Sequence, residues 1–344
     1  MFCAAAAAMM ALSCNKIENA PVTSDPEVQT ATHLVTKAVG DKTPTTFVYV
    51  ETNDVNPLNA MNYFLEDGTP FFDYVCFFSA NIHSTTVDGV VQPTLYLNPE
   101  LTPYICNNGT PVTTYTSELH NNGQEAILSV LGDWVGLGLS NMTSTQQYQF
   151  AYILSCVVEQ CGFDGVLFDD EYSGTSSIVS GSYSGIINYF AQLSPNKKIF
   201  VFDWGGTSYI SSTAAAQIDY AHHGYFGYYR SNTTSNISNM NAARWSPISL
   251  QLGQNYGTSA LSTIQNWAAN AKSSGYGQMM FFNLRATSTS VDPNAVNPIN
   301  VLNKIAAGAQ WATPVVFDGE DYEQPDPVTG GYTVTYAMAQ NCCN

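Results

Sequence analysis

Basic residues are scarce in this sequence. Its 344 residues include 10 Lys and Arg against 27 Asp and Glu, which gives a formal net charge of −17 at pH 7. A surface of that sign repels phosphate backbones, so we expect no nucleic-acid partner and a substrate that is neutral rather than anionic. Aromatic residues are plentiful, with 21 Tyr, 17 Phe and 5 Trp. Most such rings fill a protein core, but rings that stay exposed suit the faces of neutral sugars.

Motifs of several other protein classes are missing. The eight cysteines include no CxxC pair, so the sequence predicts no zinc knuckle, and we expect neither a metal nor a cofactor. No GxSxG elbow, phosphate-binding loop or dinucleotide fingerprint occurs. Cys76 lies in the apolar run FDYVCFF and is expected in the core. Cys156 and Cys161 could form a disulfide in an oxidising compartment.

A run of about 20 apolar residues, the length of a membrane-spanning helix, is also missing. The N-terminus MFCAAAAAMMALSCNKIENA has only a short apolar stretch, typical of an export signal. Ser13-Cys14 resembles the end of a bacterial lipobox, which predicts a lipoprotein anchored to the outer membrane through Cys14; a plain secretory signal over residues 1–14 is the alternative. Residues 15–43 read as a polar tether. We expect an exported monomer, either at the cell surface or secreted.

Short apolar runs rich in Val, Ile, Phe and Tyr recur along the rest of the chain, and each is typical of a buried parallel strand. The runs are TTFVYVE (45–51), FDYVCFFSANI (72–82), EAILSVLG (125–132), FDGVLFDDE (163–171), KKIFVFDWGG (197–206), IDYAHHGYFGYY (218–229), WSPISLQLG (245–253) and GQMMFFNL (277–284).

Stretches between several of these runs have helical spacing, at residues 145–161, 183–193 and 261–271, and Gly162 is a plausible stop for the first. Eight strands alternating with helices predict an α/β fold, a (β/α)8 TIM barrel over residues 44–312. A doubly wound sheet is the alternative. The acidic residues 313–344 are expected to form a C-terminal extension rather than a second domain.

Three consecutive acids end one of the predicted strands, in FDGVLFDDEYSG. Alternate side chains of a strand share a face, so Asp169 and Glu171 are predicted to face the barrel interior and Asp170 the surrounding helices. Two carboxyls so placed cannot both ionise freely, which raises the pKa of one of them. A neutral acid beside an ionised partner can protonate a glycosidic oxygen. The alternatives are an acidic loop that solvates the strand end, or a cation site.

The run DGVLFDDE resembles the DxxDxDxE signature of family 18 glycoside hydrolases, and its continuation into Tyr172 is most similar to bacterial endo-β-N-acetylglucosaminidases of the endoglycosidase H and F1 type. The likeness extends over about residues 46–312. The runs VYVETND, FDYVCFFSANI, ILSVLGDWVGLG, DYAHHGYFG and FFNL resemble strands one, two, three, six and eight of that group.

The resemblance implies roles for particular residues. Glu171 matches the general acid/base, and Asp169 matches the carboxylate that orients the substrate acetamido group. The nucleophile would be the sugar's own N-acetyl oxygen, which forms an oxazolinium ion, and configuration would be retained. Tyr225 matches a tyrosine that holds the acetamido oxygen, and Asn283 a polar residue of the −1 subsite. Asp164 is expected to be structural.

The sequence departs from the family pattern at Leu167, where the signature has its middle aspartate. It also departs in the fifth and sixth strands, at 202–204 and 222–224. Four residues there and in the third strand's loop are candidates for sugar binding: Trp134, Asp203, Trp204 and His222.

The expected activity is cleavage of the GlcNAc-β1,4-GlcNAc core of N-linked glycans. A chitin-oligosaccharide hydrolase and a catalytically weakened glycan-binding barrel are the alternatives.

Overall fold

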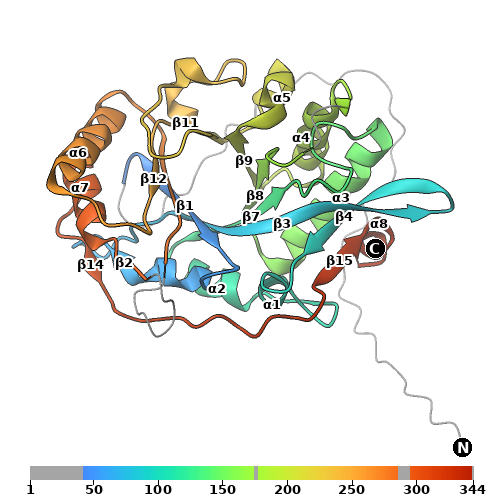
Figure 1. Cartoon of the computed structure of the whole chain (residues 1–344), viewed down its shortest axis with the longest axis horizontal. Coiled ribbons are helices and arrows are strands. Elements are labelled where there is room, and N and C mark those ends of the chain that lie inside the picture. Colours follow the sequence, from blue (N-terminus) through green and yellow to red (C-terminus); the bar gives the residue numbers. More distant parts are fainter. Residues whose placement is uncertain (1–41, 174–176, 286–294, 343–344) are drawn as a thin grey trace, which may run out of the picture.

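Nine parallel strands form the inner layer of the molecule in a computed structural model that describes residues 42–342 except 174–176 and 286–294 (Figure 1). Along the sheet they follow the order β11-β10-β9-β8-β7-β3-β1-β13-β12. Their bounds are β1 (Thr45–Glu51), β3 (Tyr74–Val87), β7 (Glu125–Leu131), β8 (Gly165–Asp169), β9 (Lys198–Asp203), β10 (Tyr220–His223), β11 (Trp245–Ser246), β12 (Ser249–Gln251) and β13 (Gln278–Phe282). The first and last predicted strands pair in parallel, so the sheet curls into the predicted barrel, nearly closed.

The barrel's remaining gap lies in the seventh predicted strand. A single strand was expected over residues 245–253, but β11 pairs with β10 and β12 pairs with β13, with Pro247 and Ile248 between them. Proline has no N–H group to donate to a neighbouring strand, which interrupts a central ladder. The chain therefore changes partners at Pro247.

Helices surround the barrel unevenly. The longest is α3 (Ser144–Cys161), which begins with a capping box between Thr143 and Gln146. It ends at the predicted stop, Gly162, which has φ 74°. The others are α1 (Thr102–Ile105), α2 (Thr114–Asn121), α4 (Ser182–Leu193), α5 (Ser212–Ala215), α6 (Thr258–Ser273) and α7 (Ile299–Ala309). After β9 and β10 the chain has only α5 and the short 3-10 turns η3 (Gly205–Tyr209), η4 (Asn232–Thr234) and η5 (Ala242–Arg244). These two units therefore carry mainly loops on the barrel's outside.

The smaller of two apolar clusters fills the inside of the barrel. It consists of side chains at alternate strand positions: Phe47, Tyr49, Tyr74, Cys76, Ile127, Leu167, Phe200, Phe202 and Met280. The larger cluster between barrel and helices takes the other strand positions. The alternation expected for β8 is therefore observed, because Leu167 lies inside and Phe168 outside.

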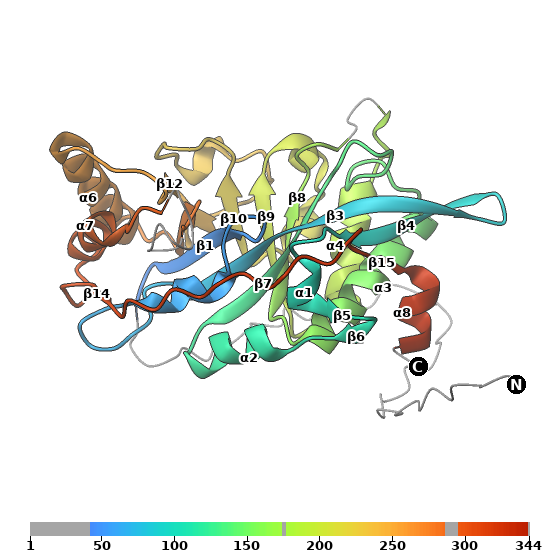
Figure 2. The ribbon, with the colours of Figure 1, turned by 60° about the horizontal axis from the view of Figure 1, so that its bottom comes forward.

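Strand β3 continues past the barrel as a long hairpin with β4 (Val90–Leu97), shown in Figure 2. The hairpin turns at Asp88 and Gly89, with φ 50° and 76°. Positive φ at both turn residues suits the twist of a two-residue hairpin loop, and glycine adopts it without strain. Shorter strands lie at β2 (Tyr63–Phe64), β5 (Cys106–Asn107) and β6 (Thr110–Pro111).

The C-terminal extension crosses the side of the barrel (Figure 2). Its strand β14 (Val316–Phe317) pairs with β2, its strand β15 (Tyr332–Thr335) pairs with β4, and its helix α8 (Tyr336–Cys342) packs on α3. Three asparagines of the 3-10 helix η1 (Pro57–Asn62) and its cap hold the segment before β15: Asn56, Asn59 and Asn62 bond main-chain atoms of residues 320–323. Residues three apart eclipse on a 3-10 helix, so one row of amides can follow an extended chain.

Cys156 and Cys161, which the sequence left as a possible disulfide, are not bonded to each other. Cys161 is a free thiol whose sulfur lies 3.3 Å from the carbonyl oxygen of Ile105, whereas Cys156 is disulfide-bonded to another cysteine. Cys76 is buried inside the barrel, as predicted.

Residues 1–41, with the predicted signal, Cys14 and most of the tether, lie outside the described part of the chain. Among the described residues, no helix has both the length and the apolar character needed to cross a bilayer.

Candidate active site

A cavity of about 390 Å³ opens at the carboxyl ends of the barrel strands. Barrel enzymes keep their active sites at this end. Three carboxyls and five aromatic rings line it: Glu51, Asp169, Glu171, Tyr49, Phe78, Phe202, Phe226 and Phe282. Three carboxyls in a pocket walled by aromatic rings suit an uncharged polyol with apolar faces.

Asp169 and Glu171 both line this cavity. Asp169 is only 3% exposed, and its Oδ1 accepts a hydrogen bond of 2.9 Å from the backbone N–H of Glu171. Burial raises the pKa of Asp169 well above its ordinary value; the nearby Glu171 and Asp170 raise it further, against the hydrogen bond. Burial also raises the pKa of Glu171. The site therefore holds two carboxyls that keep protons more readily than exposed ones, as general acid catalysis requires.

Asp170, the middle acid, points to the opposite side of β8. It is buried, and its Oδ2 accepts hydrogen bonds from Ser140 Oγ (2.5 Å) and from the backbone N–H of Gly206 (2.7 Å). Ser140 follows β7 and Gly206 follows β9. One carboxylate thus ties together the loops on both sides of the strand that carries Asp169 and Glu171.

Leu167 lies directly below Asp169 on the inner face of β8. Its side chain is 0% exposed and belongs to the interior cluster with Cys76 and Ile127. The position at which the family signature has its middle aspartate is therefore apolar and closed to solvent. Asp169 instead has the backbone N–H of Glu171 as its hydrogen-bond donor.

Glu51 is a third acid of the cavity that sequence reasoning missed. It ends β1 on the same face as Tyr49, and it is half-buried. Burial raises the pKa of Glu51, and a hydrogen bond with Asp54 raises it further, while the charge of Arg285 opposes the shift. Arg285 also forms an ion pair with Asp54. The alternation in VYVE, read from Tyr49 outward, would have placed Glu51 at the rim of the barrel.

Phe226 is the second residue that the sequence did not reveal. Its ring centroid lies 4.4 Å from that of Phe282 and 5.6 Å from that of Phe202, and all three rings line the cavity. Phe226 lies in the loop after β10, where no strand alternation predicts the side-chain direction.

Tyr225, Trp204 and Trp134 lie on the rim and are not among the residues lining the cavity. Tyr225 is 43% exposed; its ring centroid lies 5.7 Å from that of Trp204 and 3.8 Å from the guanidinium carbon of Arg230. Trp134 is 70% exposed. These exposed rings are available to stack on an extended oligosaccharide, and their roles stay predictions.

Asp203 does not face the cavity, which corrects its assignment to sugar binding. Its neighbour Phe202 takes the inner face of β9, so Asp203 points outward. There its carboxylate accepts hydrogen bonds from Thr207 Oγ1 (2.6 Å), Ser235 Oγ (3.0 Å) and the N–H of Asn236 (2.9 Å). Asp203 therefore anchors the loops that follow β9 and β10.

His222 also cannot touch a substrate, because its side chain is 0% exposed inside the barrel. Its ring contacts Phe47, with 4.6 Å between centroids. His223 faces the outside of the barrel, and its Nε2 lies 3.0 Å from the carbonyl oxygen of Pro247.

Asn283 follows Phe282 with φ 56° and is not among the residues lining the cavity. Its Oδ1 is buried without a partner among the described residues, and its amide packs closely on Gly253. Asp164 accepts hydrogen bonds from the N–H of Ala126 (2.8 Å) and from His120 (2.7 Å), so its structural role is confirmed.

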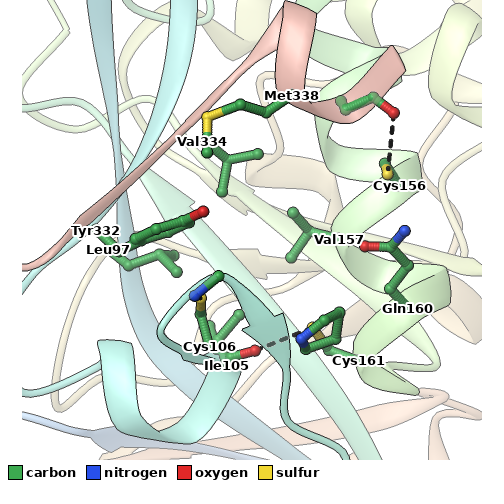
Figure 3. A pocket seen from close by; sticks show the side chains of 13 residues that line it. Leu97, Ile105, Cys106, Cys156, Val157, Gln160, Cys161, Tyr332, Val334 and Met338 are labelled. Atoms are coloured by element: carbon green, nitrogen blue, oxygen red, sulfur yellow. Dashed lines mark hydrogen bonds between the residues drawn. The ribbon is translucent and has the colours of Figure 1, made fainter. Parts of the chain in front are cut away.

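A second cavity, of about 460 Å³, lies between α3 and the C-terminal extension (Figure 3). Its walls are mostly apolar, with Cys106 and Cys161 on one side and Tyr332 and Met338 of the extension on the other. Burial raises the pKa of the Cys161 thiol to about 12. None of the described residues that line this cavity carries a carboxyl, so they offer no group for acid catalysis. Among the described residues, no group of three or more His, Cys, Asp or Glu side chains could hold a metal ion.

A barrel with two acids in one cavity at the carboxyl ends of its strands is an arrangement typical of glycoside hydrolases. No family model matches the chain. It is 29% identical over 265 residues to endo-β-N-acetylglucosaminidase F1 of Elizabethkingia meningoseptica, covering 73% of this chain and 72% of that protein. It is 30% identical over 251 residues to an endo-β-N-acetylglucosaminidase of Flavobacterium sp. (strain SK1022), covering 70% and 75%. The chain therefore belongs to the endo-β-N-acetylglucosaminidase family and is a glycoside hydrolase.

The fold also has a relative among solved structures. The crystal structure of Bacteroides thetaiotamicron EndoBT-3987 in complex with a Man9GlcNAc2Asn substrate matches with a TM-score of 0.65 at 24% sequence identity, covering 84% of this chain and 70% of that one. At that identity the match shows the shared barrel fold.

Proposed function

We propose that this enzyme hydrolyses the β1,4 bond between the two GlcNAc residues at the core of N-linked glycans and leaves one GlcNAc on the protein. Three facts support the substrate: the family to which the chain belongs, the Man9GlcNAc2Asn substrate of its structural relative, and a cavity of acids and aromatic rings. The single observation that carries the proposal is that Asp169 and Glu171 share this cavity, where burial raises the pKa of Glu171, the proposed proton donor.

Hydrolysis would proceed in two steps. In the first, Glu171 donates its proton to the glycosidic oxygen, the bond to the leaving GlcNAc breaks, and the acetamido oxygen of the other sugar attacks its own anomeric carbon. Asp169 stabilises the positive charge of the resulting oxazolinium ion. In the second step the Glu171 carboxylate takes a proton from water, which opens the ring on the face that the leaving group left. The configuration is retained, and Glu171 regains its proton.

The test compares a high-mannose glycoprotein with chitin oligomers as substrates and identifies the products by mass spectrometry. A protein that keeps one GlcNAc per site is the expected result. Release of chitobiose alone would make the enzyme a chitin-oligosaccharide hydrolase. Binding of the glycan without any product would make it a glycan-binding barrel.

Glu171→Gln should lower kcat on the glycoprotein by roughly two orders of magnitude or more, because it removes the general acid. Glu159→Gln is a matched control, since Glu159 lies on the exposed face of α3. Wild-type turnover by Glu171→Gln would overturn the assignment of the acid.

A further inference from the structure

A row of hydrogen bonds crosses the inside of the barrel and ends at the active-site cavity. Thr45 Oγ1 donates to the carbonyl oxygen of Gly277 (3.0 Å), and Gln278 Nε2 donates to Thr45 Oγ1 (3.4 Å). His222 Nε2 lies 2.5 Å from Gln278 Oε1, and Tyr49 OH lies 2.9 Å from His222 Nδ1. The four side chains are buried, and Tyr49 also lines the cavity.

The direction of each bond follows from the groups at one end. A carbonyl oxygen can only accept, so Thr45 gives its proton to Gly277 and offers lone pairs to the amide of Gln278. The other atom of that amide, Oε1, then faces His222 and can also only accept. His222 must therefore carry its proton on Nε2.

The neutral imidazole leaves Nδ1 without a proton. Burial lowers the pKa of His222 to about 3, with the hydrogen bond that its Nε2–H donates to Gln278 opposing this shift and His223 adding to it, so the ring is neutral at ordinary pH. A bare Nδ1 accepts, and the hydroxyl proton of Tyr49 is thus committed to His222. The Tyr49 oxygen can offer the cavity only lone pairs.

This polarity bears on what the cavity recognises. A tyrosine that donates would match an acetamido oxygen, but a tyrosine that only accepts matches an N–H or O–H donor. Tyr49 lies close enough to Asp169 for the carboxylate to raise its pKa, after the larger effect of burial. Tyr49 and Asp169 both line this cavity, so each can offer an acceptor oxygen to the N–H of an amide.

We propose that Tyr49 binds the amide N–H of an N-acetyl sugar, and that His222 and Gln278 are positioning residues that fix Tyr49 as an acceptor. The proposal rests on the proposed function for the identity of the sugar. It assigns the polar residues inside this barrel a purpose beyond filling the core. A purely structural row would contribute to stability and would fix the same histidine tautomer, but replacing Tyr49 would then leave ligand selectivity unchanged.

The tautomer can be read directly from nitrogen-15 NMR of the histidine side chains in the full chain. We expect the His222 resonance pair of a neutral ring with its proton on Nε2, unchanged between pH 5 and 8. A proton on Nδ1, or titration of His222 within that range, would overturn the proposal. His223→Gln serves for assignment and as the control, because His223 faces the other side of the sheet.

Selectivity is measured by calorimetry with chitobiose and with an analogue in which acetate esters replace the acetamido groups, which removes the N–H at nearly constant shape. Tyr49→Phe should reduce the wild-type preference for chitobiose roughly three- to tenfold, the range of one neutral hydrogen bond. His223→Gln should keep the full preference, and an unchanged preference in Tyr49→Phe would contradict the proposal.

His222→Phe combined with Gln278→Met replaces the buried polar pair by apolar groups and frees the Tyr49 proton, so it should resemble Tyr49→Phe. If this double variant does not fold, the tautomer and the Tyr49→Phe measurements still decide the question. Both use binding and spectroscopy, so they remain informative even if the enzyme fails to cleave N-linked glycans.

Discussion

Replacing Leu167 by Asp restores the middle acid of the family signature, and we expect it to destabilise this protein. The Leu167 side chain is 0% exposed and packs in the interior cluster with Cys76, Ile127 and Phe200. Removing a buried leucine side chain costs about 3–5 kcal/mol of unfolding free energy. Burying an incompletely bonded carboxyl adds about 1–3 kcal/mol even when it is protonated. Since a domain has about 5–15 kcal/mol in total, the loss threatens the fold.

The loss should grow with pH. Burial beside Asp169 would raise the pKa of the new carboxyl in the folded state, so the folded protein would hold its proton more tightly than the unfolded chain. The destabilisation is then smallest below the ordinary Asp value of about 4 and increases by up to about 1.4 kcal/mol per pH unit until the folded carboxyl ionises.

Urea unfolding at pH 5 and pH 8 tests this reasoning on four proteins: the wild type, Leu167→Ala, Leu167→Asn and Leu167→Asp. The Ala and Asn variants report the lost packing and should lose similar free energy at both pH values. The Asp variant should lose more at pH 8 than at pH 5. If the Asp variant is as stable as the Asn variant at both pH values and gains activity, water reaches position 167. The conclusion that the neighbourhood of Asp169 excludes water would then be wrong.

Three further changes have definite expected outcomes. Asp169→Asn should lose activity. It should nevertheless have a higher free energy of unfolding than the wild type between pH 5 and 8, because the raised pKa of Asp169 makes its ionisation costly in the folded state. Urea unfolding in which the variant and the wild type are equally stable at both pH values would contradict this. Asp170→Ala should lower the unfolding free energy by about 1–3 kcal/mol, since the buried donors of Ser140 and Gly206 lose their acceptor. A loss no greater than that of Glu159→Ala would show that Asp170 does not hold the two loops together. Glu51→Gln should raise KM for the glycoprotein several-fold and leave kcat within about twofold, as removal of a binding contact does; a drop in kcat alone would instead give Glu51 a chemical role.

The sequence predicts the barrel well because strands that are buried on both faces have continuous apolar sequences. TTFVYVE became β1 with identical bounds, and EAILSVLG became β7 with one residue fewer. The period of two along β8 was enough to place Asp169 and Glu171 in one cavity and Asp170 behind it. The break at Pro247 could have been read from the missing N–H.

The loops were less predictable, because no period applies to them. The row Asn56, Asn59 and Asn62 is visible as N-x-x-N-x-x-N, but nothing local reveals that its partner lies about 260 residues later in the chain. Phe226 and Tyr225 are adjacent, and only the loop's path decides that the phenylalanine enters the cavity while the tyrosine stays on the rim.

The error over His222 has a different cause, because its face was predicted as the inner one. In the sheet register Asp169 pairs with Phe202, and Phe202 pairs with His222. All three point inward, yet only the first two line the cavity. Strands of a closed barrel tilt against its axis, so a row of paired residues slopes from one strand to the next and reaches different depths. Alternation therefore predicts which side a residue faces, while its depth depends on the stagger of the whole barrel, and depth is what separates a residue that lines the cavity from one that is buried beneath it.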